Sequence, residues 1–466
     1  MCNSLLYQLF KEVPLEYQKE TLLRRYLYAH IGLIGQLKLA GKEAPSDWQG
    51  ALNFTYNFGP GFKDCGCRLS MEVNTHNQRT TTYNVVGVMK GIEEPDRYVI
   101  LGNHRDAWIF GAVDPSSASA VMLELTRVLT EYRRETGWSP RRTLVFCSWG
   151  SEEYGLVGSQ EWVEQFQKQL SNRGIVYLNL DMAIEGNYTV RTKSSPLLYN
   201  IGREISKLVY VPNPDPEEVR AGRSTVFDTW LYRNPDEKRP GYPRFTGLGS
   251  GSDYKGFQHN LGIPSLEYRY THSKEMFSEP LYHTLYETFY LVSELYDKGF
   301  HFHASITQLW GLIAVYIAEA EVIPFSLDEY ALFIDDAKNS IFNQFGVLIE
   351  GRNITFGHFD NASKFLPKNP LALRRINDQL MLVERAFIDA RGLPGRPPTS
   401  IHVVFAPSST DNYAATAFAG LSDALNGIED LPEDEQNRLW RTFEEHLATC
   451  TYLLMSASKI LSEELW

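Results

Sequence analysis

The sequence predicts an α/β fold: a mostly parallel sheet flanked by helices, followed by a C-terminal helical domain. Two observations support this prediction. Between about residues 79 and 320, short runs rich in Val, Ile, Leu and Tyr alternate with helical stretches, which is the pattern of a largely parallel sheet. Beyond about residue 320 the chain changes to long amphipathic stretches, which are typical of a helical bundle.

Five segments have the composition of strands: 80–91, 96–104, 141–149, 174–181 and 262–270. Between them, apolar residues recur at three- and four-residue spacing, which predicts helices over 116–134 and 159–170. The same spacing predicts C-terminal helices over 326–345, 370–388 and 433–465. We therefore expect three regions, 1–78, 79–320 and 321–466.

Composition excludes some classes of function. The chain has 466 residues and a net charge of −12, which argues against nucleic acid as a partner. No apolar run reaches the roughly 18 residues that span a bilayer, and the first thirty residues do not have the pattern of a signal peptide. Four glycosylation sequons nevertheless indicate a glycoprotein of a secretory lumen or the cell exterior; they begin at Asn53, Asn187, Asn353 and Asn361.

Metal-ligand side chains follow the predicted strands. His104 ends one strand, Glu152 and Glu153 follow the next, and Asp181 ends the third. Because ligands bind beyond the carboxyl ends of the strands in open α/β sheets, we expect these side chains to converge. Two further ligand-type residues, Asp114 and His283, lie in loops that precede helical stretches.

Two histidines and three carboxylates suit a pair of zinc ions, with one carboxylate bridging them. Glu152 and Glu153 can then take different roles: one binds metal as a ligand, and the other acts as general base and acid. Each residue also has an ordinary explanation: a hydrogen-bonded histidine, a solvated Glu-Glu helix start, or an Asp-Pro turn. The combination, in the order His, Asp, Glu-Glu, Asp, His, favours the metal site.

Long motifs carry a resemblance to a known family. They include YNFGPGF, EPDRYVILGNHRDAW, DPSSASAV, SEEYGLVGSQEW, LGSGSDY, PLYHTLYET and GLPGRP, and they run from about residue 31 to the end. In these motifs the chain resembles the M28 zinc peptidases, within them the group of glutamate carboxypeptidase II and the transferrin receptors. The resemblance implies a zinc-exopeptidase type of sheet, a peptide substrate, two Zn²⁺ per chain and a C-terminal domain that forms homodimers.

The resemblance also implies a role for each site residue. His104 and Asp181 match the ligands of one zinc, Glu153 and His283 match those of the other, and Asp114 matches the bridge. Glu152 matches the general acid/base, Tyr282 the donor to the oxyanion, and Asp106 a group that orients His104. Glu161 and Glu164 match half of a calcium site.

The same resemblance implies a substrate-binding set, consisting of Leu156, Arg191, Ser250, Gly251, Ser252, Glu267, Arg269, Asn412 and Tyr413. Three of these positions depart from the glutamate carboxypeptidases. Asn412 replaces a lysine that grips a C-terminal glutamate, Glu267 replaces an arginine, and Ser252 replaces an asparagine. A carboxylate at Glu267 would repel an acidic substrate and pair with a free α-amino group. We therefore expect an aminopeptidase of the N-acetylated-alpha-linked-acidic-dipeptidase-like type.

Relatives in this group begin with a cytoplasmic tail, a transmembrane anchor and most of an apical domain. The full-length relatives act at the extracellular face of the plasma membrane or in the secretory lumen. Residues 1–78 match only a remnant of that apical domain, so we expect a chain that is truncated at its N-terminus and lacks the anchor. Two alternatives to an aminopeptidase stay open. One is a glutamate carboxypeptidase acting on N-acylated acidic dipeptides, and the other is a receptor or scaffold that keeps the fold without turnover.

Overall fold

The computed structural model describes residues 40–46, 55–62, 74, 76, 78–273, 279–352, 369–409 and 413–462. It divides into two units, Met1–Thr81 and Thr82–Trp466, close to the predicted boundary at residue 78. In the first unit, β1 (Ala40–Glu43) pairs antiparallel with β2 (Asn57–Phe62). The predicted boundary at residue 320 stays a prediction, because the second unit is not divided further.

A six-stranded mixed sheet organises the second unit, in the order β3-β5-β4-β6-β8-β7. The strands are β3 (Val85–Met89), β4 (Glu94–His104), β5 (Arg142–Trp149), β6 (Gly174–Asn179), β7 (Thr189–Ser194) and β8 (Ser265–Thr271). The four central strands are parallel, and β3 and β7 run antiparallel at the two edges. The predicted, mostly parallel sheet is confirmed, with β7 as an additional strand.

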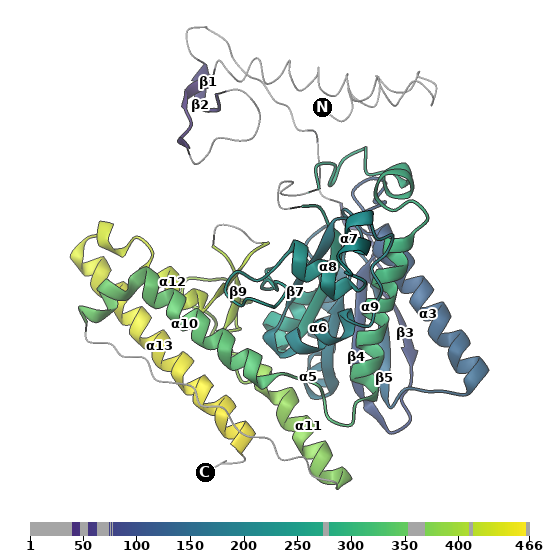
Figure 1. Cartoon of the computed structure of the whole chain (residues 1–466). Helices are drawn as coiled ribbons and strands as arrows, with labels where there is room; N and C mark the ends of the chain where they lie inside the picture. Colours follow the sequence, from purple (N-terminus) through teal and green to yellow (C-terminus); the bar gives the residue numbers. More distant parts are fainter. Residues whose placement is uncertain are drawn as a thin grey trace. The chain divides into compact units, whose positions relative to one another are not determined.

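Alternate residues of the central strands face opposite layers of helices. Val99 and Leu101 of β4 belong to one apolar core, whereas Ile100 belongs to the other. On the first face lie α3 (Ser116–Thr136) and α9 (His301–Glu319), and Figure 1 shows them in front of the sheet. On the second face lie α4 (Val157–Gln165) and α5 (Gln167–Arg173). Because both faces are covered, the central strands read as continuous apolar runs.

The predicted helix over 159–170 is wrong as a single element, because the chain turns at Phe166 between α4 and α5 (φ −106°, ψ 19°). The Phe166 ring packs on Trp162, which in turn contacts Trp149. The remaining short elements are η3 (Pro196–Leu198), α6 (Tyr199–Ser206), α7 (Pro216–Arg220), α8 (Val226–Arg233), η4 (Gly256–Asn260), η5 (Leu291–Tyr296), β9 (Phe405–Pro407), β10 (Ala415–Ala417), α12 (Ala419–Leu425) and η6 (Ile428–Asp430).

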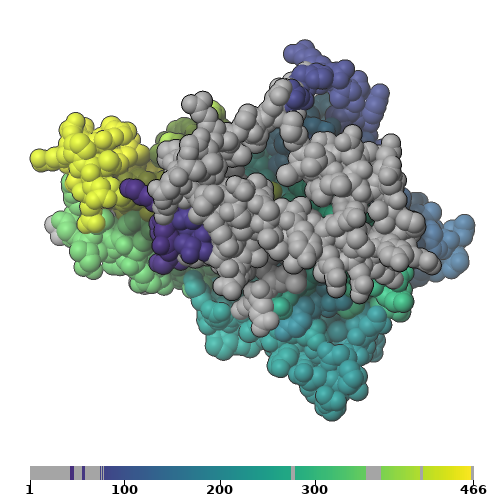
Figure 2. Space-filling view, turned by 90° about the horizontal axis from the view of Figure 1, so that it is seen from above, coloured from purple at the N-terminus to yellow at the C-terminus, as the bar shows by residue number. Residues whose placement is uncertain are grey.

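The C-terminal region is helical, as predicted. Its long helices are α10 (Leu327–Glu350), α11 (Pro370–Arg385) and α13 (Glu433–Ser462). They gather on one side of the sheet in Figure 1, and Figure 2 shows the green and yellow C-terminal residues together at one side from above. Their buried residues join the same apolar core as α3 and α9. Within the described residues, no helix combines the length and apolarity needed to cross a membrane.

Near its carboxyl end, β4 leaves room for a buried aromatic side chain. A Cβ added at Gly102 would overlap the hydroxyl of Tyr177, whose ring is fully buried and whose oxygen accepts a hydrogen bond from Trp149 Nε1 at 2.9 Å. Glycine at this position therefore lets β4 and β6 pair beside a buried tyrosine.

We predict that Gly102→Ala lowers the free energy of unfolding by about 1–3 kcal/mol, because overpacking forces Tyr177 away from Trp149. Chemical denaturation monitored by tryptophan fluorescence measures this. Gly87→Ala in β3 is the matched control, because the nearest atom to its added Cβ is 3.9 Å away. Equal stability of the two variants would contradict the prediction.

Candidate metal centre

Three neighbouring parallel strands deliver the site residues to one edge of the sheet. His104 is the last residue of β4, Glu152 and Glu153 follow β5, and Asp181 follows β6. Because β5, β4 and β6 are adjacent and parallel, their carboxyl ends meet. Asp114 reaches the same place from the turn that precedes α3.

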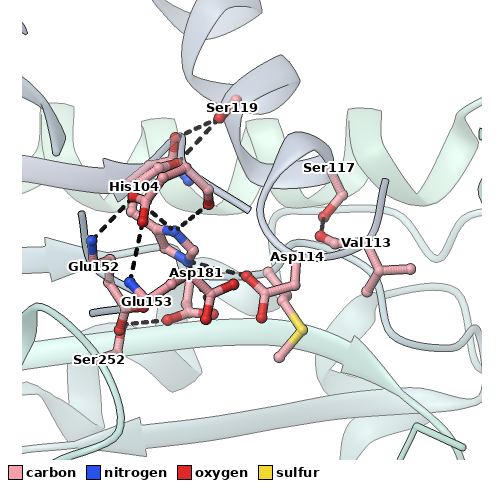
Figure 3. Close-up of polar contacts among 12 residues, drawn as sticks. His104, Val113, Asp114, Ser117, Ser119, Glu152, Glu153, Asp181 and Ser252 are labelled. Atoms are coloured by element: carbon pink, nitrogen blue, oxygen red, sulfur yellow. Dashed lines mark hydrogen bonds and ion pairs between the residues drawn. The ribbon is translucent and has the colours of Figure 1, made fainter. Parts of the chain in front are cut away.

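One group of candidate ligands consists of His104, Asp114 and Asp181. The Nε2 atom of His104 lies 3.0 Å from Oδ1 of Asp114 and 3.7 Å from Oδ1 of Asp181. All three residues are buried, with at most 5% of their surface exposed. Figure 3 shows the three side chains pointing toward one another.

A second group consists of Asp114, Glu153 and His283. The Nε2 atom of His283 lies 3.2 Å from Oδ2 of Asp114 and 3.2 Å from Oε2 of Glu153. Asp114 thus presents one oxygen to each group. Within the described part of the chain, the five residues predicted as zinc ligands converge in the predicted arrangement, with Asp114 shared.

Unpaired polar atoms test whether this cluster fits zinc. Nε2 of His104, Oδ1 of Asp114 and Oε1 of Glu153 are buried and make no well-aligned hydrogen bond to a described residue, although the first two atoms face each other at 3.0 Å. Buried polar atoms normally have partners, and these three are a nitrogen and two carboxylate oxygens, the donor types that zinc prefers. The residues therefore fit zinc.

The cluster also holds more negative charge than it can neutralise. Burial, with repulsion from Asp181, raises the pKa of Glu152 to about 10. Burial, with repulsion from Asp114, raises the pKa of Glu153 to about 7. The carboxyl groups thus take up protons unless another positive charge enters, which is the electrostatic condition for cation binding.

Backbone and side-chain contacts of Asp106 hold the candidate ligands in place. Nδ1 of His104 lies 3.1 Å from the backbone oxygen of Asp106 and 3.8 Å from its carboxylate. The carboxylate of Asp106 instead accepts the backbone N–H groups of Glu152 at 3.0 Å and Glu153 at 3.1 Å. Asp106 thus contacts the His104 ring, as its predicted role requires, mainly through its backbone oxygen, and its side chain also holds the Glu152-Glu153 turn.

Glu267 does not offer a free carboxylate to a substrate. Only 1% of its surface is exposed, and its oxygens lie 3.1 Å from Nδ2 of Asn179 and 3.2 Å from Arg269. Nζ of Lys193 is 3.9 Å away. The expected pairing of Glu267 with a substrate amino group is thus corrected, because buried partners already neutralise this carboxylate.

Ser252 and Arg269 are buried as well. Ser252 donates a hydrogen bond to Asp181, a candidate ligand, and accepts one from Asn179. Arg269 binds Glu185 at 3.1 Å. Both residues therefore contact other buried residues of the site. The predicted substrate residue Arg191 differs, because its side chain is 41% exposed.

Among the other predicted substrate residues, Tyr413 and Gly251 lie beside Tyr282. The side chain of Tyr413 hydrogen-bonds Tyr282, and its ring lies against the backbone of Gly251. The neighbouring Ser250 is half-buried, whereas Leu156 is buried at the start of α4 in a left-handed conformation. Asn412 lies outside the described residues.

The calcium site stays a prediction. Glu161 and Glu164 are exposed on α4, and Glu164 accepts a hydrogen bond from Gln160 at 2.9 Å. The metal-ligand groups found among the described residues do not include them.

Sequence reasoning missed Glu287, a buried carboxylate that touches the backbone of two ligand residues. The one signal in the sequence is its position four residues after His283, within the motif PLYHTLYET. His283 alone was taken to explain that motif.

Comparisons with known proteins agree with this site. The family model for peptidase family M28 matches residues 84–294, the span that holds all five candidate ligands. The chain contains a peptidase family M28 domain. A second model, the transferrin receptor-like dimerisation domain, matches residues 355–462, which follow the M28 domain.

Curated relatives match along most of the chain. Aminopeptidase NAALADL1 of Rattus norvegicus is 33% identical over 91% of this chain and 59% of its own length. Glutamate carboxypeptidase 2 homolog of Caenorhabditis briggsae is 34% identical over 86% of this chain and 56% of its own length. The chain thus spans a little more than half the length of these relatives. Among solved structures, a zinc aminopeptidase from Bacillus subtilis matches 50% of this chain and 49% of its own chain, at 26% identity and a TM-score of 0.36.

We predict that the metal-free M28 domain loses stability as pH rises from about 5 to 8. The pKa of Glu152 is raised to about 10, so the folded state holds a proton that the unfolded chain releases near pH 4.5, and the free energy of unfolding falls with pH across this window. The raised pKa of His104, where the carboxylates of Asp181 and Asp114 outweigh burial, acts in the same direction. Zinc should reverse the trend, because its ligands must be deprotonated.

Scanning calorimetry with chelator and with added zinc, at pH 5.5, 7 and 8, measures this dependence. Glu152→Gln removes one titrating group and should flatten the slope in chelator. A melting temperature that rises with pH in chelator would show that the cluster does not carry the predicted charge.

Proposed function

We propose that the chain is a dizinc exopeptidase that hydrolyses peptide bonds. The observation that carries this proposal is the sharing of Asp114 between two groups of ligand-type side chains, one with His104 and the other with His283. Two metal ions bridged by one carboxylate are the arrangement of many hydrolytic two-metal sites. When bound, such a zinc pair polarises the scissile carbonyl group and activates water for attack.

In this proposal Glu152 moves the proton. Its carboxyl group lies in the cluster but belongs to neither ligand group, so it can accept a proton from the attacking water and pass it to the leaving nitrogen. Its raised pKa shows that the surroundings favour its protonated form, which suits a group that must return a proton. Metal ions would lower this pKa from about 10 toward the working range.

Tyr282 would stabilise the negative charge on the carbonyl oxygen. Its ring stacks on that of His283, with 3.7 Å between centroids, which places it beside the second ligand group. Burial, with repulsion from Asp114, raises the pKa of its hydroxyl, so the phenol keeps the proton that it donates. A single donor of this kind contributes about 3–4 kcal/mol to catalysis.

We propose further that the chain is an aminopeptidase, releasing N-terminal amino acids. Two facts support this subclass: Asn412 supplies no positive charge for a C-terminal glutamate, and a curated relative bears the name of an aminopeptidase. Glu267 no longer supports it, because its charge is neutralised inside the protein.

One observation favours a second candidate, a glutamate carboxypeptidase. The side chain of Arg191 is 41% exposed and lies 3.7 Å from Glu185, while Arg269 already pairs with that same glutamate at 3.1 Å. The cationic group of Arg191 is therefore available to an acidic substrate. A curated relative also bears the name of a glutamate carboxypeptidase homologue.

We predict that the chain cleaves peptides with a free amino terminus and spares N-acetylated ones, and that Glu152→Gln lowers kcat by about 10²–10⁴-fold while zinc content is unchanged. Liquid chromatography of a peptide panel, free and N-blocked, with and without chelator, measures this. Glu135→Gln, an exposed residue of α3, is the control.

The alternatives give other results in the same assay. Release of glutamate from N-acylated acidic dipeptides would support the carboxypeptidase instead. Bound zinc without hydrolysis of any peptide would support the scaffold, and would overturn the proposed function.

We also propose that the chain forms a homodimer through its C-terminal helices, on the strength of the match to a dimerisation domain over residues 355–462. Light scattering at micromolar concentration should give about twice the mass of 53.3 kDa. A monomer at that concentration would contradict this proposal without affecting the metal centre.

A further inference from the structure

Glu287 lies behind the second ligand group and connects the two loops that form it. Its carboxylate oxygen Oε1 accepts the backbone N–H of Asp114 at 2.7 Å, and Oε2 accepts the backbone N–H of His283 at 3.0 Å. Its own backbone oxygen accepts the N–H of Ala112 at 3.2 Å. Only 2% of its surface is exposed, so water does not compete for these contacts.

The two loops need such support. His283 has a left-handed backbone (φ 57°), which is costly for a residue with a Cβ atom and persists only when the surroundings hold it. Asp114 lies just before α3, in a turn where Gly111 is also left-handed (φ 58°). Asp114 and His283 are 169 positions apart in the chain, and within the described residues Glu287 is hydrogen-bonded to the backbone of both.

We propose that Glu287 is a positioning residue that sets the spacing between Asp114 and His283, so that both can bind the same metal ion. This inference rests on the proposed function, since it concerns the same metal centre. A carboxylate is required because both of its oxygens accept a backbone N–H. A glutamine has one oxygen and one NH₂ group, and the NH₂ group would face an N–H donor.

The turn after β5, which carries Glu152 and Glu153, is held by a carboxylate in the same way. Asp106 accepts the N–H groups of Glu152 and Glu153 with its two oxygens, as Glu287 does for Asp114 and His283. Each carboxylate fixes the backbone from which two site residues project. Charge-assisted hydrogen bonds of this kind are stronger than neutral ones, and groups that orient ligands typically change metal affinity by about 10–100-fold when they are removed.

Glu287→Gln tests the proposal through zinc binding, which does not depend on turnover. In a competition titration against a chromophoric chelator, the wild-type chain should bind two zinc ions. Glu287→Gln should weaken the zinc ion held by Glu153 and His283 by about 10–100-fold. The ion held by His104 and Asp181 should be weakened less, because Asp114 is its only ligand that contacts Glu287. Its kcat should fall while KM stays near the wild-type value.

Glu279→Gln is the matched control. Glu279 is a buried carboxylate just before the same loop, and it also accepts a backbone N–H, that of Leu281 at 2.9 Å. Its other partners are His272 and Tyr296. This variant should lose thermal stability as Glu287→Gln does, but should keep both zinc affinities.

Two unchanged zinc affinities in Glu287→Gln, or equal losses in both variants, would overturn the proposal and leave Glu287 a purely structural residue. Wild-type chain that binds two zinc ions without hydrolysing peptides overturns the proposed function alone, because the titration still tests Glu287. Wild-type chain that binds no zinc overturns both.

Discussion

The crowding of carboxylates around Asp114 is the constraint on which this structure depends. Asp114 is 3% exposed and lies 3.0 Å from the ring of His104 and 3.2 Å from that of His283, with Asp181 and Glu153 at the same two rings. Burying several acids together is costly unless a cation joins them. The site is therefore arranged for a state in which positive charge is present.

The sheet supplies the rigidity that such crowding requires. Parallel pairing of β5, β4 and β6 brings three strand ends together, and two buried cores on opposite faces hold these strands in register. The loops that carry Asp114 and His283 have no such scaffold. Hydrogen bonds from their backbone to the buried Glu287 take its place, much as Asp106 holds the turn after β5.

Much of this could be predicted from the sequence, because the signals were local. An apolar run that ends in His104, or in Glu152 and Glu153, predicts a strand and at the same time places a site residue at the end of that strand. β7 was missed because its sequence, TVRTKS, has a single apolar residue, Val190, and pairing with β8 makes it a strand. Glu267 was misread because its partners Arg269 and Lys193 converge on it only after folding. Glu287 was missed because a carboxylate that binds backbone N–H groups leaves no pattern in side-chain types.

The most direct test of the central claim is anomalous X-ray diffraction at the zinc edge from crystals grown with zinc. The account predicts two peaks about 3.5–4 Å apart, one beside His104 and Asp181, the other beside Glu153 and His283, with Asp114 contacting both. A single peak, or two peaks with Asp114 bound to only one of them, would contradict it.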